Sequence, residues 1–150
     1  MSATATKFSA YTRVDVETAS QGKLVIMLFN GAIKRAEEAK RQLEKGKNES
    51  VHNNLIRAQD IIAELRGALN MNMGEVSRNL DRIYEYFQHL LITANIHKES
   101  TPINECVELL TNMRDTWQQA FDTVAKEGVQ PVLHPSHANP HGASMLNIRG

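Results

Sequence analysis

Residues 74–96, GEVSRNLDRIYEYFQHLLITANI, carry the clearest periodic pattern in the chain. Apolar side chains recur there in steps of three and four residues, which places them on one face of a helix. The stretch therefore predicts an amphipathic helix that ends near Ile96 and buries one face against other helices. The seam of that helix consists of Val76, Leu80, Ile83, Phe87, Leu90 and Ala94.

Three more stretches with a helical period flank this one, at about 18–45, 51–70 and 101–126. Ser20 or Thr18 is the expected N-cap of the first helix, because a hydroxyl can accept from an orphan backbone N–H. Short connections between four such helices favour antiparallel neighbours. The predicted fold class is therefore all-α, an antiparallel four-helix bundle.

The three flanking helices also have expected core faces, defined by the same spacing of apolar residues. Gly46 is expected to end the first helix, and Thr101-Pro102 to begin the last. The expected core residues are Leu24, Leu28, Ala32, Ala39 and Leu43 on the first helix, Leu55, Ala58, Ile62, Leu65 and Leu69 on the second, and Ile103, Cys106, Leu110, Met113, Trp117, Phe121 and Val124 on the last.

The two ends of the chain differ in composition from the helical part. Residues 1–17 are polar and lack a sustained period, which predicts a flexible N-terminal arm with Tyr11 and Val14 as its apolar landmarks. Residues 128–150 are rich in Pro, His, Asn and Ser, which predicts a disordered C-terminal tail. The bundle domain is thus expected at 18–127.

Composition argues against several classes of partner. Lys+Arg and Asp+Glu are both 17, and no basic stripe interrupts the mixed charges, so a nucleic-acid partner is not expected. The longest apolar run, Leu24 to Phe29, is far too short to cross a bilayer, so no membrane insertion is expected. A single cysteine, Cys106, excludes an intramolecular disulfide, and together with the absence of a secretory signal this predicts a cytoplasmic protein.

No catalytic, cofactor or metal constellation is evident in the residue pattern. A carboxylate-bridged metal bundle needs two Glu-x-x-His pairs, and the chain has one, at 49–52. The tail histidines at 134, 137 and 141 hold a metal weakly at most. We therefore expect no enzyme, cofactor or metal, although a metal-binding or phosphorelay bundle is kept as an alternative for which His52 and His89 are the residues to consider.

The helices carry more apolar residues than one core needs. On the first helix Phe29, Ile33 and Ile26 widen the apolar arc to roughly 200°. Beyond the seams of the next two helices lie Ile56, Ala63, Gly67, Asn70, Tyr84, Tyr86, Ile92 and Ile96. Because monomers seldom expose large apolar patches, this surplus favours a groove for an amphipathic helix or for a segment that folds on docking.

Other interpretations of the surplus stay open. One is that these residues are ordinary exposed apolar surface, and another is that the core is placed differently from the expected seams. Alternatively, an unrelated helical adaptor or a homodimer uses the same faces, burying Ile56, Ile92 and Phe29 by self-association. Light scattering of the protein alone distinguishes the self-association from a groove for another protein.

An ordered set of short segments resembles a known family. The segments are Thr18-Ala19-Ser20, residues 27–33 (MLFNGAI), 58–65 (AQDIIAEL), Leu69-Asn70, Gly74-Glu75-Val76, Asn79-Leu80, 83–86 (IYEY), Ala94-Asn95 and 113–117 (MRDTW). In this order and spacing they resemble the FliS family of flagellar secretion chaperones over roughly residues 11–122. Departures from the family pattern are Phe29-Asn30, Gln21-Gly22 and Met73.

The resemblance implies an antiparallel four-helix bundle without enzymatic activity. It implies that the chain binds the C-terminal segment of newly made flagellin in the cytoplasm, prevents premature polymerisation and keeps flagellin competent for flagellar type III secretion. In this family the N-terminal arm, with Tyr11 by position, covers part of the flagellin site. The arm is also expected to help docking at the flagellar export gate.

The side chains of Asn70, Asn79 and Asn95 fit an extended partner, because an amide offers both a donor and an acceptor to a backbone. Their alternative role is helix capping or bonding between helices. The predicted partner-binding residues are Tyr11, Val14, Phe29, Ile33, Ile56, Ala63, Gly67, Asn70, Asn79, Tyr84, Ile92 and Asn95.

Overall fold

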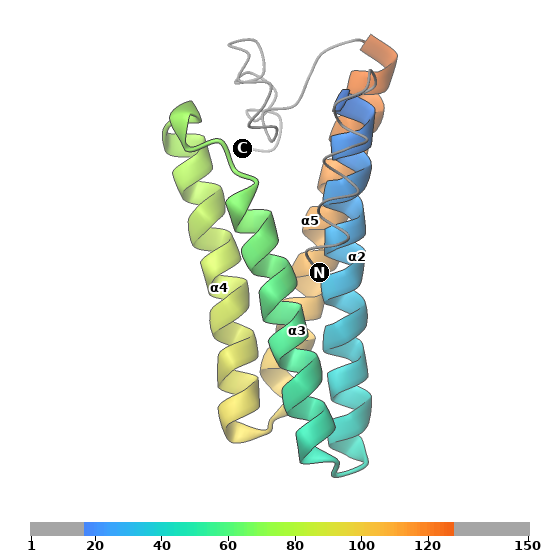
Figure 1. Cartoon of the computed structure of the whole chain (residues 1–150), viewed down its shortest axis with the longest axis vertical. Coiled ribbons are helices and arrows are strands. Elements are labelled where there is room, and N and C mark those ends of the chain that lie inside the picture. The colour runs from blue at the N-terminus through green and yellow to red at the C-terminus, as the bar shows by residue number, and fades with distance from the viewer. Residues whose placement is uncertain (1–16, 128–150) are drawn as a thin grey trace.

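A computed structural model of the chain describes residues 17–127, which form four long α-helices (Figure 1). The elements are α2 (Glu17–Glu44), α3 (Asn48–Gly67), the short 3-10 helix η1 (Met71–Met73), α4 (Glu75–His97) and α5 (Ser100–Glu127). The expected N-terminal arm, with Tyr11 and Val14, and the expected C-terminal tail lie outside the described residues.

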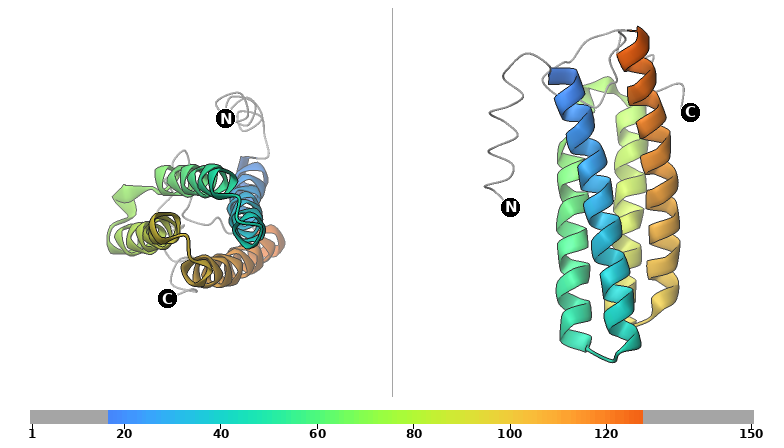
Figure 2. Two further views of the ribbon diagram at one scale, coloured as in Figure 1. Left: turned by 90° about the horizontal axis from the view of Figure 1, so that it is seen from below. Right: turned by 90° about the vertical axis from the view of Figure 1, so that its right-hand side faces the viewer.

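Consecutive helices run in opposite directions and pack side by side. Helices α2 and α4 each contact both α3 and α5, so the four helices close into a ring around one core (Figure 2). This arrangement confirms the predicted antiparallel four-helix bundle. The first and last helices begin earlier than expected. Helix α2 starts at Glu17, so Thr18 and Ser20 lie inside it and neither is its N-cap. Helix α5 starts at Ser100.

The turn between α2 and α3 explains why α2 ends where it does. Gly46 has a φ of +71°, a backbone conformation that glycine adopts without steric cost. The Lys47 N–H donates to the Gln42 carbonyl and the Gly46 N–H to the Leu43 carbonyl, both at 3.0 Å. These two bonds are the Schellman pattern, so the prediction that Gly46 ends the first helix is confirmed.

Lys98 ends α4 in a similar way, although it is not a glycine. Its φ of 52° lies in the left-handed region, and the Glu99 N–H donates to the Ala94 carbonyl at 3.2 Å. The Lys98 Nζ donates to the Asn95 backbone carbonyl at 2.7 Å and to its Oδ1 at 2.8 Å. These bonds offset the steric cost of the left-handed conformation and bring α5 back antiparallel to α4.

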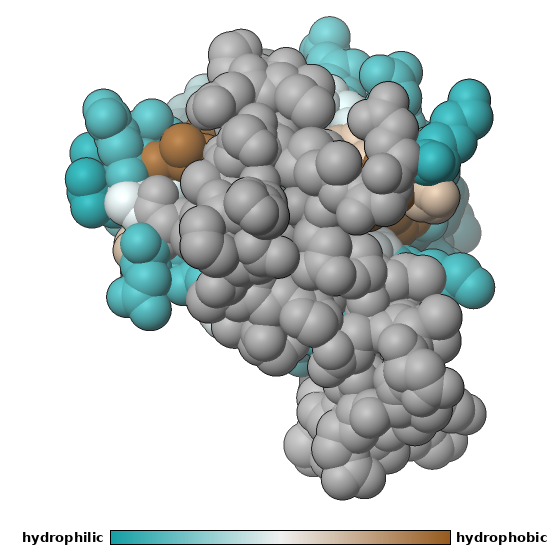
Figure 3. Space-filling view, turned by 90° about the horizontal axis from the view of Figure 1, so that it is seen from above, coloured by the Kyte–Doolittle hydropathy of each residue, from teal (hydrophilic) through white to brown (hydrophobic). Residues whose placement is uncertain are grey.

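Two glycines let α2 approach its neighbours closely. A Cβ at Gly22 would lie 3.2 Å from the Phe121 ring of α5, and one at Gly31 would lie 3.3 Å from Ile61 Cδ1 of α3. Helix α2 therefore packs tightly against both neighbours. In the view from above, the coloured side chains at the edge of the bundle are mostly hydrophilic, and hydrophobic ones show in only a few places (Figure 3).

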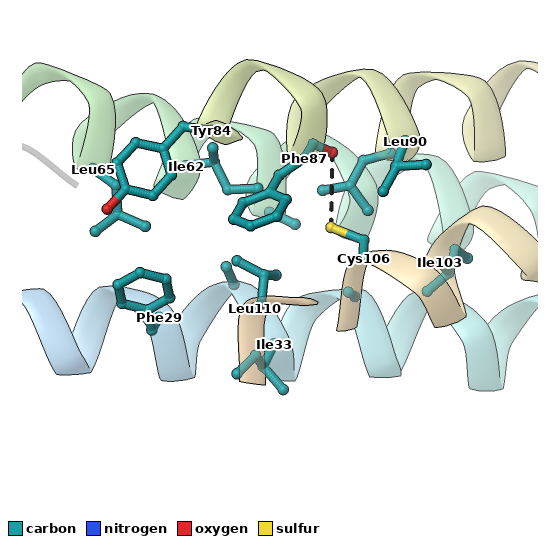
Figure 4. Close-up of a cluster of buried hydrophobic side chains, with 14 of the residues drawn as sticks. Phe29, Ile33, Ile62, Leu65, Tyr84, Phe87, Leu90, Ile103, Cys106 and Leu110 are labelled. Atoms are coloured by element: carbon teal, nitrogen blue, oxygen red, sulfur yellow. Dashed lines mark hydrogen bonds between the residues drawn. The ribbon is translucent and has the colours of Figure 1, made fainter. Parts of the chain in front are cut away.

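The core forms a continuous apolar layer contributed by all four helices (Figure 4). The Tyr84 ring lies 6.2 Å from that of Phe29 and 6.1 Å from that of Phe87, in tilted contacts that link α2 to α4. The expected seam of α3 is confirmed, because Leu55, Ala58, Ile62, Leu65 and Leu69 are all buried.

The predicted core faces of the other helices are confirmed in part. The predicted residues that are buried are Ala32 and Ala39 on α2, Leu80, Phe87, Leu90 and Ala94 on α4, and Ile103, Cys106, Leu110, Trp117 and Val124 on α5. On α2, Val25 and Phe29 point inward, while Leu24 and Leu28 are half-buried. On α4, Tyr84 and Leu91 are buried, whereas Ile83 stands 36% exposed. On α5, Ala120 is buried, and Met113 and Phe121 are half-buried.

Three predicted surface residues are therefore in the core. Phe29 and Tyr84 have no exposed area and Ile33 is 8% exposed, so the expectation that they line an accessible groove is wrong. The wide apolar arc of α2 is covered by its two neighbours in the ring, α3 and α5. Tyr84 is inward because its ring fills the space between Phe29 and Phe87.

Candidate partner-binding face

Seven large apolar side chains remain exposed among the described residues. They are Met27 (53%), Ile56 (37%), Met71 (49%), Ile83 (36%), Tyr86 (43%), Ile92 (44%) and Ile96 (71%). They do not form one patch, because they lie on both sides of α4 as well as on α2, α3 and η1. The contacts between helices decide which of them share a surface.

A line of polar contacts joins α3 to α4 along their length. At one end, Asn95 Nδ2 lies 2.8 Å from His52 Nδ1. In the middle, the Gln88 amide donates to the Gln59 backbone carbonyl at 3.2 Å. Towards the other end, Arg66 donates to the Gln88 Oε1 at 2.8 Å. These contacts fix the register of the two antiparallel helices.

Ile56 and Ile92 lie on the outer side of this line. Ile56 follows His52 by one helical turn and Ile92 precedes Asn95 by about one turn, so both are within roughly 60° of the contact line around their helices. The register set by the His52–Asn95 contact brings them to the same level of the bundle. Ile96 continues the stripe on α4 at 71% exposure.

Helix α3 continues the apolar stripe with small residues. Ala63 and Gly67 are exposed and follow Ile56 at helical spacing. A Cβ at Gly67 would meet nothing within 4 Å, so the surface there is open to an approaching backbone. We call the surface formed by Ile56, Ala63, Gly67, Ile92 and Ile96 the α3/α4 face.

One ion pair beneath this face is partly shielded from solvent. Arg66 donates to both carboxylate oxygens of Asp81, at 2.8 and 2.9 Å, and each side chain is about 30% exposed. The hydrogen bond to Arg66 lowers the pKa of Asp81 below its ordinary value, and the same bond raises the pKa of Arg66. The pair therefore stays charged and holds α3 to α4 at neutral pH.

The three predicted asparagines all have partners within the bundle. Asn70 is 7% exposed, and its Oδ1 accepts from the Asn72 N–H at 3.1 Å, which caps η1. Asn79 is exposed and its Oδ1 accepts from Arg82 at 2.7 Å. Asn95 bridges His52 and Lys98. Capping and interhelical bonding thus account for Asn70 and Asn95, and burial corrects the expectation that Asn70 is accessible.

The opposite side of α4 carries a second, smaller cluster beside α5. The Tyr86 hydroxyl donates to the Glu105 carboxylate of α5, and the Tyr86 ring stacks on His89 at 6.4 Å. Glu105 raises the pKa of Tyr86 through that bond. We call Ile83 and Tyr86 the α4/α5 cluster.

Three of the exposed apolar residues, Met27, Met71 and Ile83, were not predicted to be exposed. Ile83 satisfies the seam period of α4, so spacing alone assigns it to the core. Gly74 has a φ of +79° and lies in the break between α3 and α4. The glycine indicates a turn in the sequence, and Met71, three residues before it, could have been predicted to be exposed on that ground.

The described residues do not bring metal ligands together. Within residues 17–127, no group of three or more His, Cys, Asp or Glu side chains could hold a metal ion. Burial raises the pKa of the Cys106 thiol to about 12, and its Sγ donates to the Phe87 carbonyl at 3.7 Å, so it is a packed thiol. None of the described helices is long and apolar enough to cross a membrane.

Comparison with known proteins identifies the family. The sequence model of the family described as "Flagellar protein FliS" matches residues 4–124. The chain is 36% identical over 120 residues to the flagellar secretion chaperone FliS of Bacillus subtilis (strain 168), covering 80% of this chain and 90% of that protein. It is 34% identical over 122 residues to the flagellar secretion chaperone FliS of Salmonella typhimurium (strain LT2), covering 77% and 90%. These matches confirm the predicted resemblance and the prediction that the chain is not an enzyme: it belongs to the FliS family of flagellar secretion chaperones.

Proposed function

We propose that this chaperone binds the C-terminal segment of flagellin in the cytoplasm, prevents its premature polymerisation and keeps it competent for flagellar type III secretion. The observation that carries the proposal is the α3/α4 face, where Ile56, Ile92 and Ile96 remain exposed on two helices held in fixed register. The family supplies the client, since its members are secretion chaperones of the flagellum.

The face suits an amphipathic segment that folds as it docks. Isoleucines at helical spacing on neighbouring helices provide apolar anchors, and Ala63 and Gly67 leave room for the backbone of the client. Ordering such a segment costs roughly 2–5 kcal/mol of the gross interaction. The complex can therefore be specific and still release its client, which secretion requires.

Residues buried in the bundle take a different part in this proposal. Phe29, Ile33 and Tyr84 support the face from below by fixing α2 and α4, and do not contact the client in this conformation. Asn79 and Asn95 are accessible at the sides of α4 and stay proposed contacts. The contributions of Tyr11 and Val14, and docking at the export gate, stay predictions.

Calorimetry with a peptide of the cognate flagellin C-terminus tests the proposal. We expect one-to-one binding, weakened about fivefold to tenfold by Ile92→Ser, since the loss of a partly exposed isoleucine anchor removes about 1 kcal/mol. Ile83→Ser is the matched control, because Ile83 has similar exposure but lies on the other side of α4. No heat for the unsubstituted protein at high micromolar peptide, or equal losses for both variants, contradicts the proposal.

Self-association is the alternative use of the same face. If the α3/α4 face is a homodimer interface, light scattering of the protein alone gives twice the monomer mass, and Ile92→Ser restores the monomer. A monomer that gains mass only when the flagellin segment is added supports the proposed function.

A further inference from the structure

The chain continues for 23 residues after α5, beyond the part that the family model matches. This segment, 128–150, holds one dense apolar group, Met145, Leu146 and Ile148, and a smaller one, Val132 and Leu133. We propose that Met145, Leu146 and Ile148 dock on the α3/α4 face of the same molecule, against Ile56 and Ile92, and so compete with any incoming client.

The position of the α5 end makes this path available. Helix α5 ends at the same end of the bundle as η1 and the start of α4 (Figure 1). Ile92 lies roughly 25 Å along α4 from Glu75, at 1.5 Å per residue. Because α5 neighbours α2 and α4 but not α3, the path must also pass around α4. Passing around α4 adds one or two interhelical spacings of about 10 Å each, so the path from the end of α5 to Ile92 is roughly 35–45 Å long.

Chain length then selects which apolar group can dock. Met145 follows Glu127 by about 18 residues, so an extended chain reaches roughly 60 Å, which exceeds the required path. Leu133 follows Glu127 by about six residues and reaches only roughly 20 Å. The group at 145–148 is therefore the one within reach of Ile56 and Ile92.

Tethering favours this occupant over a second copy of the chain. A tethered segment acts at an effective concentration in the millimolar range, so even a weak contact is populated. The face also has the character such a contact needs, because Ile92 and Ile96 are 44% and 71% exposed, and Ile56, at the level of Ile92, is 37% exposed. The docked segment would reduce apolar exposure while no client is present.

A spin label at position 147 tests the contact in the full chain without flagellin. Asn147→Cys is labelled with a nitroxide, and the buried Cys106, whose pKa is raised to about 12, stays unmodified. We expect loss of the δ1-methyl NMR signals of Ile56 and Ile92, while that of Ile83 on the other side of α4 is retained. Retention of all three signals, or equal loss of all three, overturns the proposal.

Two sets of substitutions and a mixed sample complete the design. Met145→Ser/Leu146→Ser/Ile148→Ser should restore the Ile56 and Ile92 signals, and the matched control Val132→Ser/Leu133→Ser should not. In the mixed sample, one protein carries the nitroxide but no isotope label, and the other carries the isotope label but no nitroxide. Signal loss in this mixture indicates contact with a second copy and overturns the intramolecular contact. Because no flagellin is present, these outcomes are separate from those that test the proposed function.

Discussion

Arg66 donates through Nε and Nη2 to the two carboxylate oxygens of Asp81, at 2.8 and 2.9 Å, and thereby fixes α3 against α4. The geometry is bidentate, which restrains both the spacing and the register of the two helices. The same Arg66 reaches Gln88 through Nη1, so one side chain holds two points of α4 that lie about two helical turns apart. The α3/α4 face depends on this register, because Ile56 and Ile92 come from different helices.

We expect Asp81→Asn to destabilise the fold by about 1 kcal/mol at pH 7, a value discounted because both side chains are about 30% exposed. The measurement is urea unfolding followed by far-UV circular dichroism, with the exposed Asp60→Asn on α3 as the control. An Asp81→Asn variant as stable as the unsubstituted protein would show that the ion pair does not stabilise the packing of α3 on α4.

The same pair sets a pH dependence whose sign follows from the lowered pKa of Asp81. A carboxyl whose folded pKa is below its unfolded value stabilises the fold above the unfolded pKa. That stabilisation is lost as the pH falls below the ordinary value of 3.8 and through the lowered folded pKa. We therefore expect the stabilities of the unsubstituted protein and Asp81→Asn to converge in acid, and a constant difference across the titration contradicts the assignment.

Two glycines near the α3–α4 connection should respond to alanine with opposite signs. Gly67 has open space around its missing Cβ and is the last residue of α3, so Gly67→Ala gains part of the helix propensity of an interior site, up to about 0.5 kcal/mol. Gly74 has a φ of +79°, so Gly74→Ala costs about 1–3 kcal/mol. Thermal unfolding of the Gly67→Ala and Gly74→Ala variants measures the two changes in stability. A stabilised Gly74→Ala variant would contradict the backbone geometry at Gly74.

Cys106 should be inert towards thiol reagents in the folded protein. Its burial raises its pKa to about 12, so little of the reactive thiolate exists at pH 8. We expect no colour with Ellman's reagent under native conditions and one equivalent in denaturant. Rapid native reaction would mean that α5 opens locally around Cys106.

The Tyr86–Glu105 bond predicts an altered tyrosine titration. Because the carboxylate accepts from the hydroxyl and raises the pKa of Tyr86, Glu105→Gln should move that pKa back towards 10.0. NMR of the Tyr86 ring across the alkaline range measures the change, with Glu108→Gln as the control. An unchanged Tyr86 titration in Glu105→Gln would exclude the interhelical bond.

The sequence was sufficient for α3, where the large residues of the core seam are separate from the second stripe of Ile56, Ala63 and Gly67. Every expected core residue of α3 is buried, from Leu55 to Leu69, because its period leaves only one orientation. Helix α2 is apolar over a much wider arc, so the period could not choose between the Leu24 side and the Phe29 side. The close approach at Gly22 and Gly31, which depends on neighbouring helices, made that choice.

The candidate site was predicted in part for the same reason. Ile56 and Ile92 lie away from their seams and are exposed as expected. Tyr84 and Ile83 are adjacent in sequence, and which of them points inward depends on Phe29 of another helix. The hydrogen-bond partners of Asn95, on α3 and in the turn after α4, likewise could not be read from one helix.

The proposed function depends on binding of the flagellin C-terminal segment to the α3/α4 face. Isoleucine δ1-methyl NMR of the full chain, recorded while that segment is added, locates the binding surface. We expect saturable shifts at Ile56, Ile92 and Ile96, with Ile83 the least affected of the exposed isoleucines. Saturable shifts centred on Ile83 with Ile56 and Ile92 unmoved would contradict it.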